Sequence, residues 1–203
     1  MMRETYELID LKKLQNNVRT IVHYSSNYHI AVVKADCYGL GIKCIESILK
    51  GGANYLAVSS LDEALKVRKI TSEGILVLEP IDINYIDLAI QNNITLTISS
   101  LDYLMKIKNK KFTCHIKINT GMNRLGISSK DEFNKVINLM EENNNVYLEG
   151  LFTHFATPGI NDRYFDMQVH NFKNITSDID IKSIPIVHLS SSFILLAHPK
   201  IEF

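Results

Sequence analysis

Short apolar runs recur along this 203-residue chain, and each is followed by a segment whose apolar residues recur with helical spacing. The runs cover roughly residues 29–36, 55–60, 74–80, 94–100, 112–120, 147–155 and 183–191. Strands that alternate with helices form a parallel sheet, which is either open or closed into a (β/α)8 TIM-type barrel. No Gly-x-Gly-x-x-Gly follows the first run, and polar residues gather at the C-terminal ends of several runs. Both observations favour a barrel, incomplete because it has about seven strands and no closing one.

Two capping boxes predict where helices begin. Ser60 is followed three residues later by Glu63, and Ser129 is followed in the same way by Glu132. Behind the second box, apolar residues recur with helical spacing and predict one buried helix face, made of Phe133, Val136, Ile137 and Met140. The pair Gly51-Gly52 predicts the end of the first helix.

Composition excludes several classes of function. Lysine plus arginine (22) equals aspartate plus glutamate (22), so the net charge is zero and no long-range field attracts nucleic acid. Three cysteines without paired spacing are typical of a reducing compartment. No apolar run is long enough for a signal core or a membrane span. We therefore expect a cytoplasmic protein with one domain, residues 1–203, and neither a nucleic-acid nor a membrane partner.

Lys34 ends the apolar run of residues 30–34, in which Ile30, Val32 and Lys34 share one face of the predicted strand, so alternation directs the lysine inward. Burial lowers the pKa of an amine, which suits covalent chemistry at a carbonyl. The surrounding segment 31–41, AVVKADCYGLG, resembles the motif of alanine racemases whose lysine binds pyridoxal 5'-phosphate (PLP) covalently. The resemblance implies that Tyr38 binds the PLP phosphate. Asp36 and Leu40 stand where the family commonly has asparagine and histidine.

A second segment, KINTGMNRLG at residues 117–126, resembles the racemase loop whose arginine lies near the substrate carboxylate and the PLP phenolic oxygen. Arg124 matches that arginine, and a guanidinium is suited to a carboxylate because it is planar and permanently charged. Many family members carry a carbamylated lysine at the position of Lys117. The resemblance implies that carbon dioxide converts this cation into an anion beside Arg124.

Two further segments resemble the same family. In LEGLFTHFA, residues 148–156, His154 matches a histidine that lies against the PLP ring. In IVHLSSSF, residues 186–193, Ser192 matches a phosphate-binding serine, and Ser191 replaces the usual asparagine. A hydroxyl and backbone amides at a strand-to-helix turn form an anion site.

The resemblance implies an alanine racemase, an isomerase that uses PLP to interconvert L- and D-alanine and so supplies D-alanine for peptidoglycan. Lys34 is one of its two bases. The second is a tyrosine from the C-terminal β-domain of the partner subunit in a homodimer, and an eighth strand supplies an arginine to the pyridine nitrogen. Neither is in these 203 residues. The chain is therefore a fragment or truncated product of a racemase, or it works without a second domain, and we expect little or no racemase activity from it alone.

Four alternatives remain open at this point. A serine racemase would keep every motif quoted above. A non-catalytic PLP-binding barrel of the cofactor-homeostasis type explains the length but not the Arg124 segment. An amino-acid decarboxylase of related fold would have different surroundings for its arginine and lysine. A metal-dependent barrel hydrolase would use His115, His154 and His188 as ligands.

Overall fold

The computed structural model describes residues 5–24, 28–157, 159–160, 162–189 and 191–197. Its strands are β1 (Ile30–Val32), β2 (Tyr55–Val58), β3 (Gly74–Val77), β4 (Leu96–Ile98), β5 (Phe112–Lys117), β6 (Val146–Phe152) and β7 (Ile186–His188). Each falls inside or within one residue of a predicted run. Its helices are α1 (Leu11–Val22), α2 (Lys34–Tyr38), α3 (Ile45–Lys50), α4 (Leu61–Arg68), α5 (Ile86–Gln91), α6 (Leu101–Ile107), α7 (Lys130–Glu141), α8 (Arg163–Ile175) and α9 (Ser192–Ala197).

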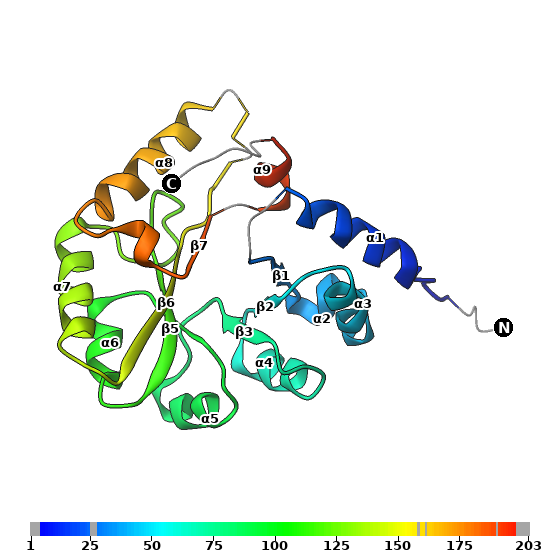
Figure 1. Ribbon diagram of the computed structural model, residues 1–203, viewed down its shortest axis with the longest axis horizontal. Coiled ribbons are helices and arrows are strands. Elements are labelled where there is room, and N and C mark those ends of the chain that lie inside the picture. Colours follow the sequence, from blue (N-terminus) through cyan, green and yellow to red (C-terminus); the bar gives the residue numbers. More distant parts are fainter. Residues whose placement is uncertain (1–4, 25–27, 158, 161, 190, 198–203) are drawn as a thin grey trace.

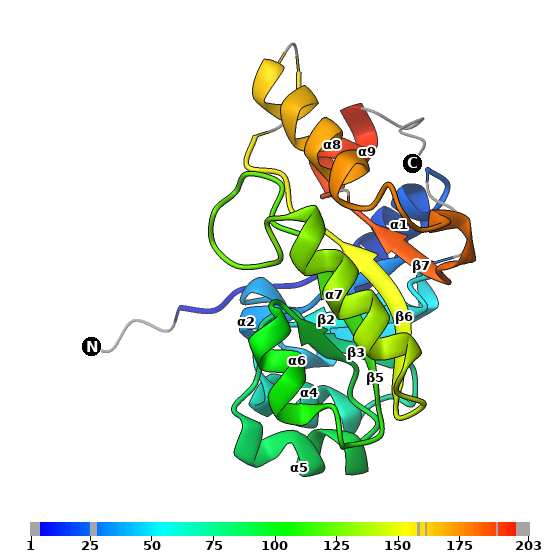
Figure 2. The same cartoon turned by 90° about the vertical axis from the view of Figure 1, so that its left-hand side faces the viewer.

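The strands form a parallel sheet that curves into a partial barrel with helices on its outer side (Figures 1 and 2). One part has the order β1-β2-β3 and the other β4-β5-β6-β7, and an isolated bridge between Leu76 and Thr95 joins them. Among the described residues β1 and β7 each pair with a single strand. The prediction of an α/β barrel with seven strands and no closing strand is therefore confirmed for this part of the chain.

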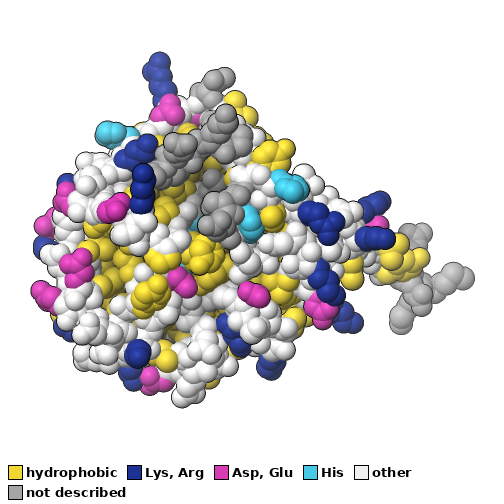
Figure 3. All heavy atoms as spheres, in the orientation of Figure 1, with side chains coloured by type: hydrophobic (Ala, Val, Ile, Leu, Met, Phe, Trp, Pro, Cys, Tyr) yellow, Lys and Arg dark blue, Asp and Glu magenta, His cyan; other side chains and the backbone are white. Residues whose placement is uncertain are grey.

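Apolar side chains fill two regions. The larger lies between strands and helices, and the predicted face of α7 is buried in it through Phe133, Val136, Ile137 and Met140. The smaller lies inside the barrel and consists of Tyr55, Ala57, Leu76, Phe152 and Ile186. In Figure 3 charged side chains are scattered over the periphery of the face, in keeping with the zero net charge. No helix among the described residues is long and apolar enough to cross a membrane.

In both capping boxes the predicted hydrogen bond to the serine hydroxyl is confirmed. The Ser60 hydroxyl accepts from the Glu63 amide at 3.3 Å, and Ser129 accepts from Glu132 at 3.2 Å. Each glutamate side chain also reaches a neighbouring strand–helix unit. The Glu63 carboxylate accepts from the Ala35 amide at 2.8 Å, and that of Glu132 accepts from Leu101 at 3.0 Å. These glutamates therefore connect neighbouring units of the barrel.

One prediction about the elements is confirmed in part, and another is wrong. Gly51 does cap the end of a helix, but this helix is α3 and is not the first, because the unpredicted α1 precedes it. The sequence does contain the signal for this helix, because Leu14, Val18 and Ile21 recur with helical spacing, and Leu14 and Val18 pack against the core. The first strand was expected over 29–36 but ends at Val32. The backbone turns there, because four consecutive residues after Lys34 adopt left-handed conformations.

Candidate functional site

Lys34 begins a left-handed turn at the C-terminal end of β1. The φ angles of Ala35, Asp36, Cys37 and Tyr38 are 51°, 53°, 57° and 55°. A left-handed conformation costs a residue with a side chain roughly 1–2 kcal/mol. The neighbours hold the turn, since Glu63 accepts from the Ala35 amide and Cys37 is buried. Strain of this kind is characteristic of functional sites. Lys34 is half-buried and lies outside the strand that was expected to carry it.

Three cations and a histidine gather at the C-terminal ends of the strands. Lys117 ends β5 with 5% of its surface exposed. Burial lowers the pKa of Lys117 to about 8, with Arg124 and Lys34 acting in the same direction and Glu79 opposing them. Among the described residues Lys34, Lys117 and Arg124 form no ion pair. The cluster therefore carries positive charge that an anionic ligand would balance.

A tight loop brings Arg124 next to Lys117. The Ile127 amide donates to the Lys117 carbonyl at 2.9 Å, which closes the loop onto the strand that it leaves. Gly126 has φ 122°, and a Cβ there would lie 2.8 Å from the Asn119 nitrogen. Because this contact is with backbone, only glycine fits. The Asn119 side chain also accepts from the Asn123 amide at 2.9 Å.

His154 follows β6 and faces the same cluster. Its pKa is lowered by partial burial first and then by the charges of Lys117, Arg124 and Lys34. These effects favour the neutral imidazole, which has one donor and one acceptor nitrogen. Four of the predicted site residues are thus close enough for their charges to interact.

The two predicted phosphate-binding residues lie on exposed segments. Tyr38 closes the left-handed turn with 64% of its surface exposed, and Ser192 begins α9 just beyond β7. A Cβ on Gly39 or Gly41 would meet no atom within 4 Å, so there is open space beside the turn. The Ser191 hydroxyl accepts from the Ile194 amide at 3.4 Å and caps α9. No contact connects Tyr38 or Ser192 to the cationic cluster within the described residues.

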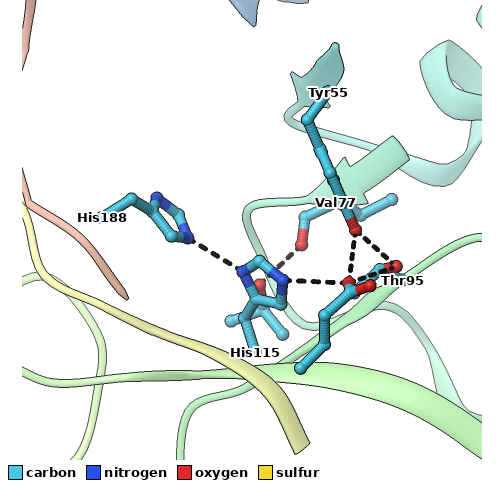
Figure 4. A network of polar contacts seen from close by, with 7 residues as sticks. Tyr55, Val77, Thr95, His115 and His188 are labelled. Carbon is cyan, nitrogen blue, oxygen red and sulfur yellow. Dashed lines mark hydrogen bonds and ion pairs between the residues drawn. The ribbon is translucent and has the colours of Figure 1, made fainter. Parts of the chain in front are cut away.

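Aromatic rings lie beneath Lys117 inside the barrel. The Lys117 ammonium lies 4.9 Å from the centroid of Phe152, and the Phe152 ring stacks on His188 at 4.7 Å. His188 Nε2 lies 2.8 Å from His115 Nδ1, and His115 Nε2 lies 3.1 Å from the Glu149 carboxylate (Figure 4). Burial first, and then His115 and Lys117, hold the pKa of His188 well below its ordinary value.

This buried chain continues to Tyr55, whose hydroxyl lies 2.7 Å from both Glu149 and Thr95. From the sequence, His115 and His188 are candidates only as metal ligands. The imidazole rings of His115 and His188 are hydrogen-bonded to each other. The described residues contain no group of three histidine, cysteine, aspartate or glutamate side chains that could hold a metal ion. The hydrolase interpretation with His115, His154 and His188 as ligands is therefore wrong for this structure.

Comparison with known proteins finds relatives that match most of the length of this chain. The pattern that defines the alanine racemase N-terminal domain matches residues 9–203. Alanine racemase 1 of Bacillus subtilis is 36% identical over an alignment of 199 positions, which covers 94% of this chain and 51% of that protein. The alanine racemase of Streptococcus agalactiae is 37% identical over an alignment of 214 positions, gaps included, which covers 99% of this chain and 57% of that protein. The chain spans about half the length of these relatives.

Solved structures give the same result for the fold. The alanine racemase of E. faecalis superposes with a TM-score of 0.90 at 29% identity, over 96% of this chain and 55% of that one. A histidine racemase from Leuconostoc mesenteroides shares the fold with a TM-score of 0.86 at 24% identity.

Proposed function

Because this chain belongs to the alanine racemase family through the N-terminal domain, we propose that it carries the PLP-binding half of a racemase that interconverts L- and D-alanine. The observation that carries the proposal is the cluster of Lys34, Lys117, Arg124 and His154 at the C-terminal ends of β1, β5 and β6. A barrel active site is assembled in this way from several strands.

The cluster is chemically suited to PLP. Lys34 offers an amine for the aldehyde, and the three cations, which form no ion pair in the described part of the chain, suit the negative charges of the phosphate and of an amino-acid carboxylate. The open space beside Gly39 and Gly41 leaves room for a phosphate near Tyr38. In this proposal Lys34 holds PLP, Tyr38 and Ser192 bind its phosphate, and His154 lies against its ring.

Bound PLP supplies an electron sink, which makes the Cα proton of an amino acid acidic. The Lys34 amine then takes and returns that proton on one face of the substrate. Arg124 holds the substrate carboxylate, because a guanidinium stays charged at every relevant pH. Racemisation needs a second acid–base group on the opposite face. In the family this group comes from the C-terminal domain of the partner, so we expect the 203-residue polypeptide alone to racemise alanine weakly or not at all.

The experiment that tests this proposal is PLP titration followed by borohydride reduction and peptide mapping. We expect a visible absorption band, and after reduction a PLP label on the peptide containing Lys34. Lys34→Ala should abolish both, whereas Lys50→Ala, at an exposed lysine on α3, should leave both unchanged. A label spread over surface lysines, or one retained in Lys34→Ala, would refute the assignment.

Carbamylation of Lys117 is a separate part of the proposal. The neutral amine attacks carbon dioxide, a nitrogen–carbon bond forms and one proton is released. A pKa of about 8 keeps much more of this amine neutral near pH 7.5 than an ordinary lysine would be. The product is an anion that attracts Arg124 instead of repelling it. With ¹³C-bicarbonate we expect a carbamate signal at pH 8 that is missing in Lys117→Met, and an unmodified amine under these conditions would count against the proposal.

Racemases for alanine and serine would share this half of the site, so the amino acid is assigned from the relatives. Assays of D/L interconversion with both substrates, on the chain joined to the C-terminal domain of a relative, distinguish them. A non-catalytic PLP-binding barrel would lack any rate with either amino acid. The Arg124 loop favours the racemase, because a cofactor carrier has no need of a carboxylate anchor.

A further inference from the structure

Helix α8 presents a row of polar side chains to the loop that carries Arg124. Tyr164, Gln168 and Asn171 are spaced so that they share one helix face. The Tyr164 hydroxyl donates to the Gly121 carbonyl at 2.6 Å, and the Asn171 amide donates to the Thr120 carbonyl at 2.8 Å. Because Gly121 and Thr120 begin the loop, α8 is joined to the segment that leads to Arg124.

Gln168, in the middle of this row, is completely buried and joins two parts of the site. Its side-chain nitrogen donates to the Thr120 hydroxyl at 3.0 Å and to the His154 carbonyl at 3.4 Å. Its side-chain oxygen accepts from the Ala156 amide at 2.9 Å. A single buried amide thus connects the start of the Arg124 loop with the segment that carries His154.

The hydrogen-bond directions in this network are fixed. Thr153 donates its hydroxyl proton to the Ile118 carbonyl at 2.8 Å, so it must accept from Thr120, whose hydroxyl lies 2.9 Å away. The Thr120 proton is then committed, and its oxygen can only accept from Gln168. The side chain at position 168 must therefore donate toward Thr120 and accept from Ala156, which requires an amide.

We propose that Gln168 is a positioning residue that fixes Arg124 relative to His154, acting through Thr120 on one side and through the backbone of residues 154–156 on the other. This inference rests on the proposed roles of Arg124 and His154. It is tested without PLP, so failure of PLP to bind and failure of this inference are separate results.

Two substitutions separate the two halves of the amide. Gln168→Glu keeps an oxygen for the Ala156 amide but places an acceptor opposite the Thr120 hydroxyl and the His154 carbonyl. Gln168→Met has a similar length and removes both functions. Thr176→Val is the matched control, since Thr176 is buried at the C-cap of the same helix and its hydroxyl donates to the Phe172 carbonyl at 2.9 Å, away from the site.

The measurements are NMR amide hydrogen exchange and titration of the His154 imidazole in the complete 203-residue chain. In Gln168→Met we expect faster exchange at Ala156 and in residues 120–126. In Gln168→Glu only residues 120–126 should exchange faster, and Thr176→Val should change neither region. The histidine titration is compared in Gln168→Met and the control, because a carboxylate at 168 would itself act on the imidazole.

The cations that act on His154 are Lys117 from β5, Arg124 from its loop and Lys34 from the turn after β1. If Gln168→Met lets Arg124 move away, the measured pKa of His154 should rise by about 0.5. If Gln168 only stabilised the fold, Gln168→Met would lower the melting temperature, but the pKa of His154 would equal its value in Thr176→Val. An unchanged His154 pKa together with unchanged exchange in residues 120–126 would overturn the inference.

Discussion

Lys117 shows how a single side chain at the site acts on the stability of the whole chain. Its folded-state pKa of about 8 lies below the ordinary lysine value of about 10.4. Between these two values the unfolded chain binds more protons than the folded chain, so this group makes stability rise with pH. Below pH 8 the full cost of burying the charge is present, and above about pH 10 that cost has disappeared.

We therefore expect Lys117→Met to stabilise the chain by about 2–3 kcal/mol at pH 7 and by little at pH 10. Urea unfolding of both proteins at pH 7, 8.5 and 10, in buffer free of carbon dioxide, measures this difference. The raised thiol and phenol pKa values elsewhere in the core, such as that of Cys37 at about 11, are common to both proteins and cancel. A stability difference between the two proteins that does not vary with pH would contradict the lowered pKa of Lys117.

At the scale of elements, the capping glutamates of α4 and α7 each accept a hydrogen bond from a backbone amide of a neighbouring unit, one at the site and the other away from it. Glu63 accepts from the Ala35 amide in the Lys34 turn, whereas Glu132 accepts from the Leu101 amide at the start of α6. Loss of Glu132 leaves this one backbone N–H without its acceptor, whereas loss of Glu63 leaves two, because Glu63 also accepts from the Ser59 amide at 2.8 Å. Glu132→Ala should lower the free energy of unfolding by about 1–2 kcal/mol, and Glu63→Ala by about twice as much.

Their effects on PLP should differ. Only Glu63→Ala releases the strained turn, so it should weaken PLP binding by about tenfold, which corresponds to roughly 1.4 kcal/mol. Glu132→Ala is the control, with matched chemistry at a distant junction. Absorbance titration with PLP compares the two, and equal affinities would show that Glu63 does not hold the turn for binding.

The elements also show where sequence patterns succeed. All seven strands were predicted because buried parallel strands are nearly continuous apolar runs. The left-handed turn was not, since Ala35 and Tyr38 carry no signal for positive φ. The motifs did predict that Lys34, Lys117, Arg124 and His154 belong to one site, and their mutual electrostatic effects agree.

Other functional features lacked such a signal. Gln168 gave none on its own, because only the structure shows that its amide meets both Thr120 and Ala156. The pattern that would have revealed it is a polar residue within the buried apolar stripe of α8, since Gln168 lies at helical spacing between Phe165 and Phe172. The contact between His115 and His188 depends on the register of β5 and β7, which pair with β6 between them. Sequence spacing does not contain that register.

At the scale of the molecule, the described strands have two edges, β1 and β7, each with one paired neighbour (Figure 1). β5 lies between β4 and β6 and carries buried side chains along nearly its whole length. Edge strands open by local fluctuation, whereas central strands exchange their amide protons only when much of the domain unfolds. Two predicted PLP contacts lie just beyond these edges, since Lys34 follows β1 and Ser192 follows β7.

We therefore expect amide hydrogen exchange to be at least roughly tenfold faster in β1 and β7 than in β5. Adding PLP at a hundred times its Kd contributes about 2.7 kcal/mol to the folded state. Because the proposed contacts bridge the two edges, protection should increase in β1 and β7 more than in β4 and β5. Lys34→Ala, exposed to the same PLP concentration, should show no gain. Uniform protection of all seven strands before PLP is added, or an equal gain in every strand afterwards, would mean that the partial barrel already behaves as one cooperative unit.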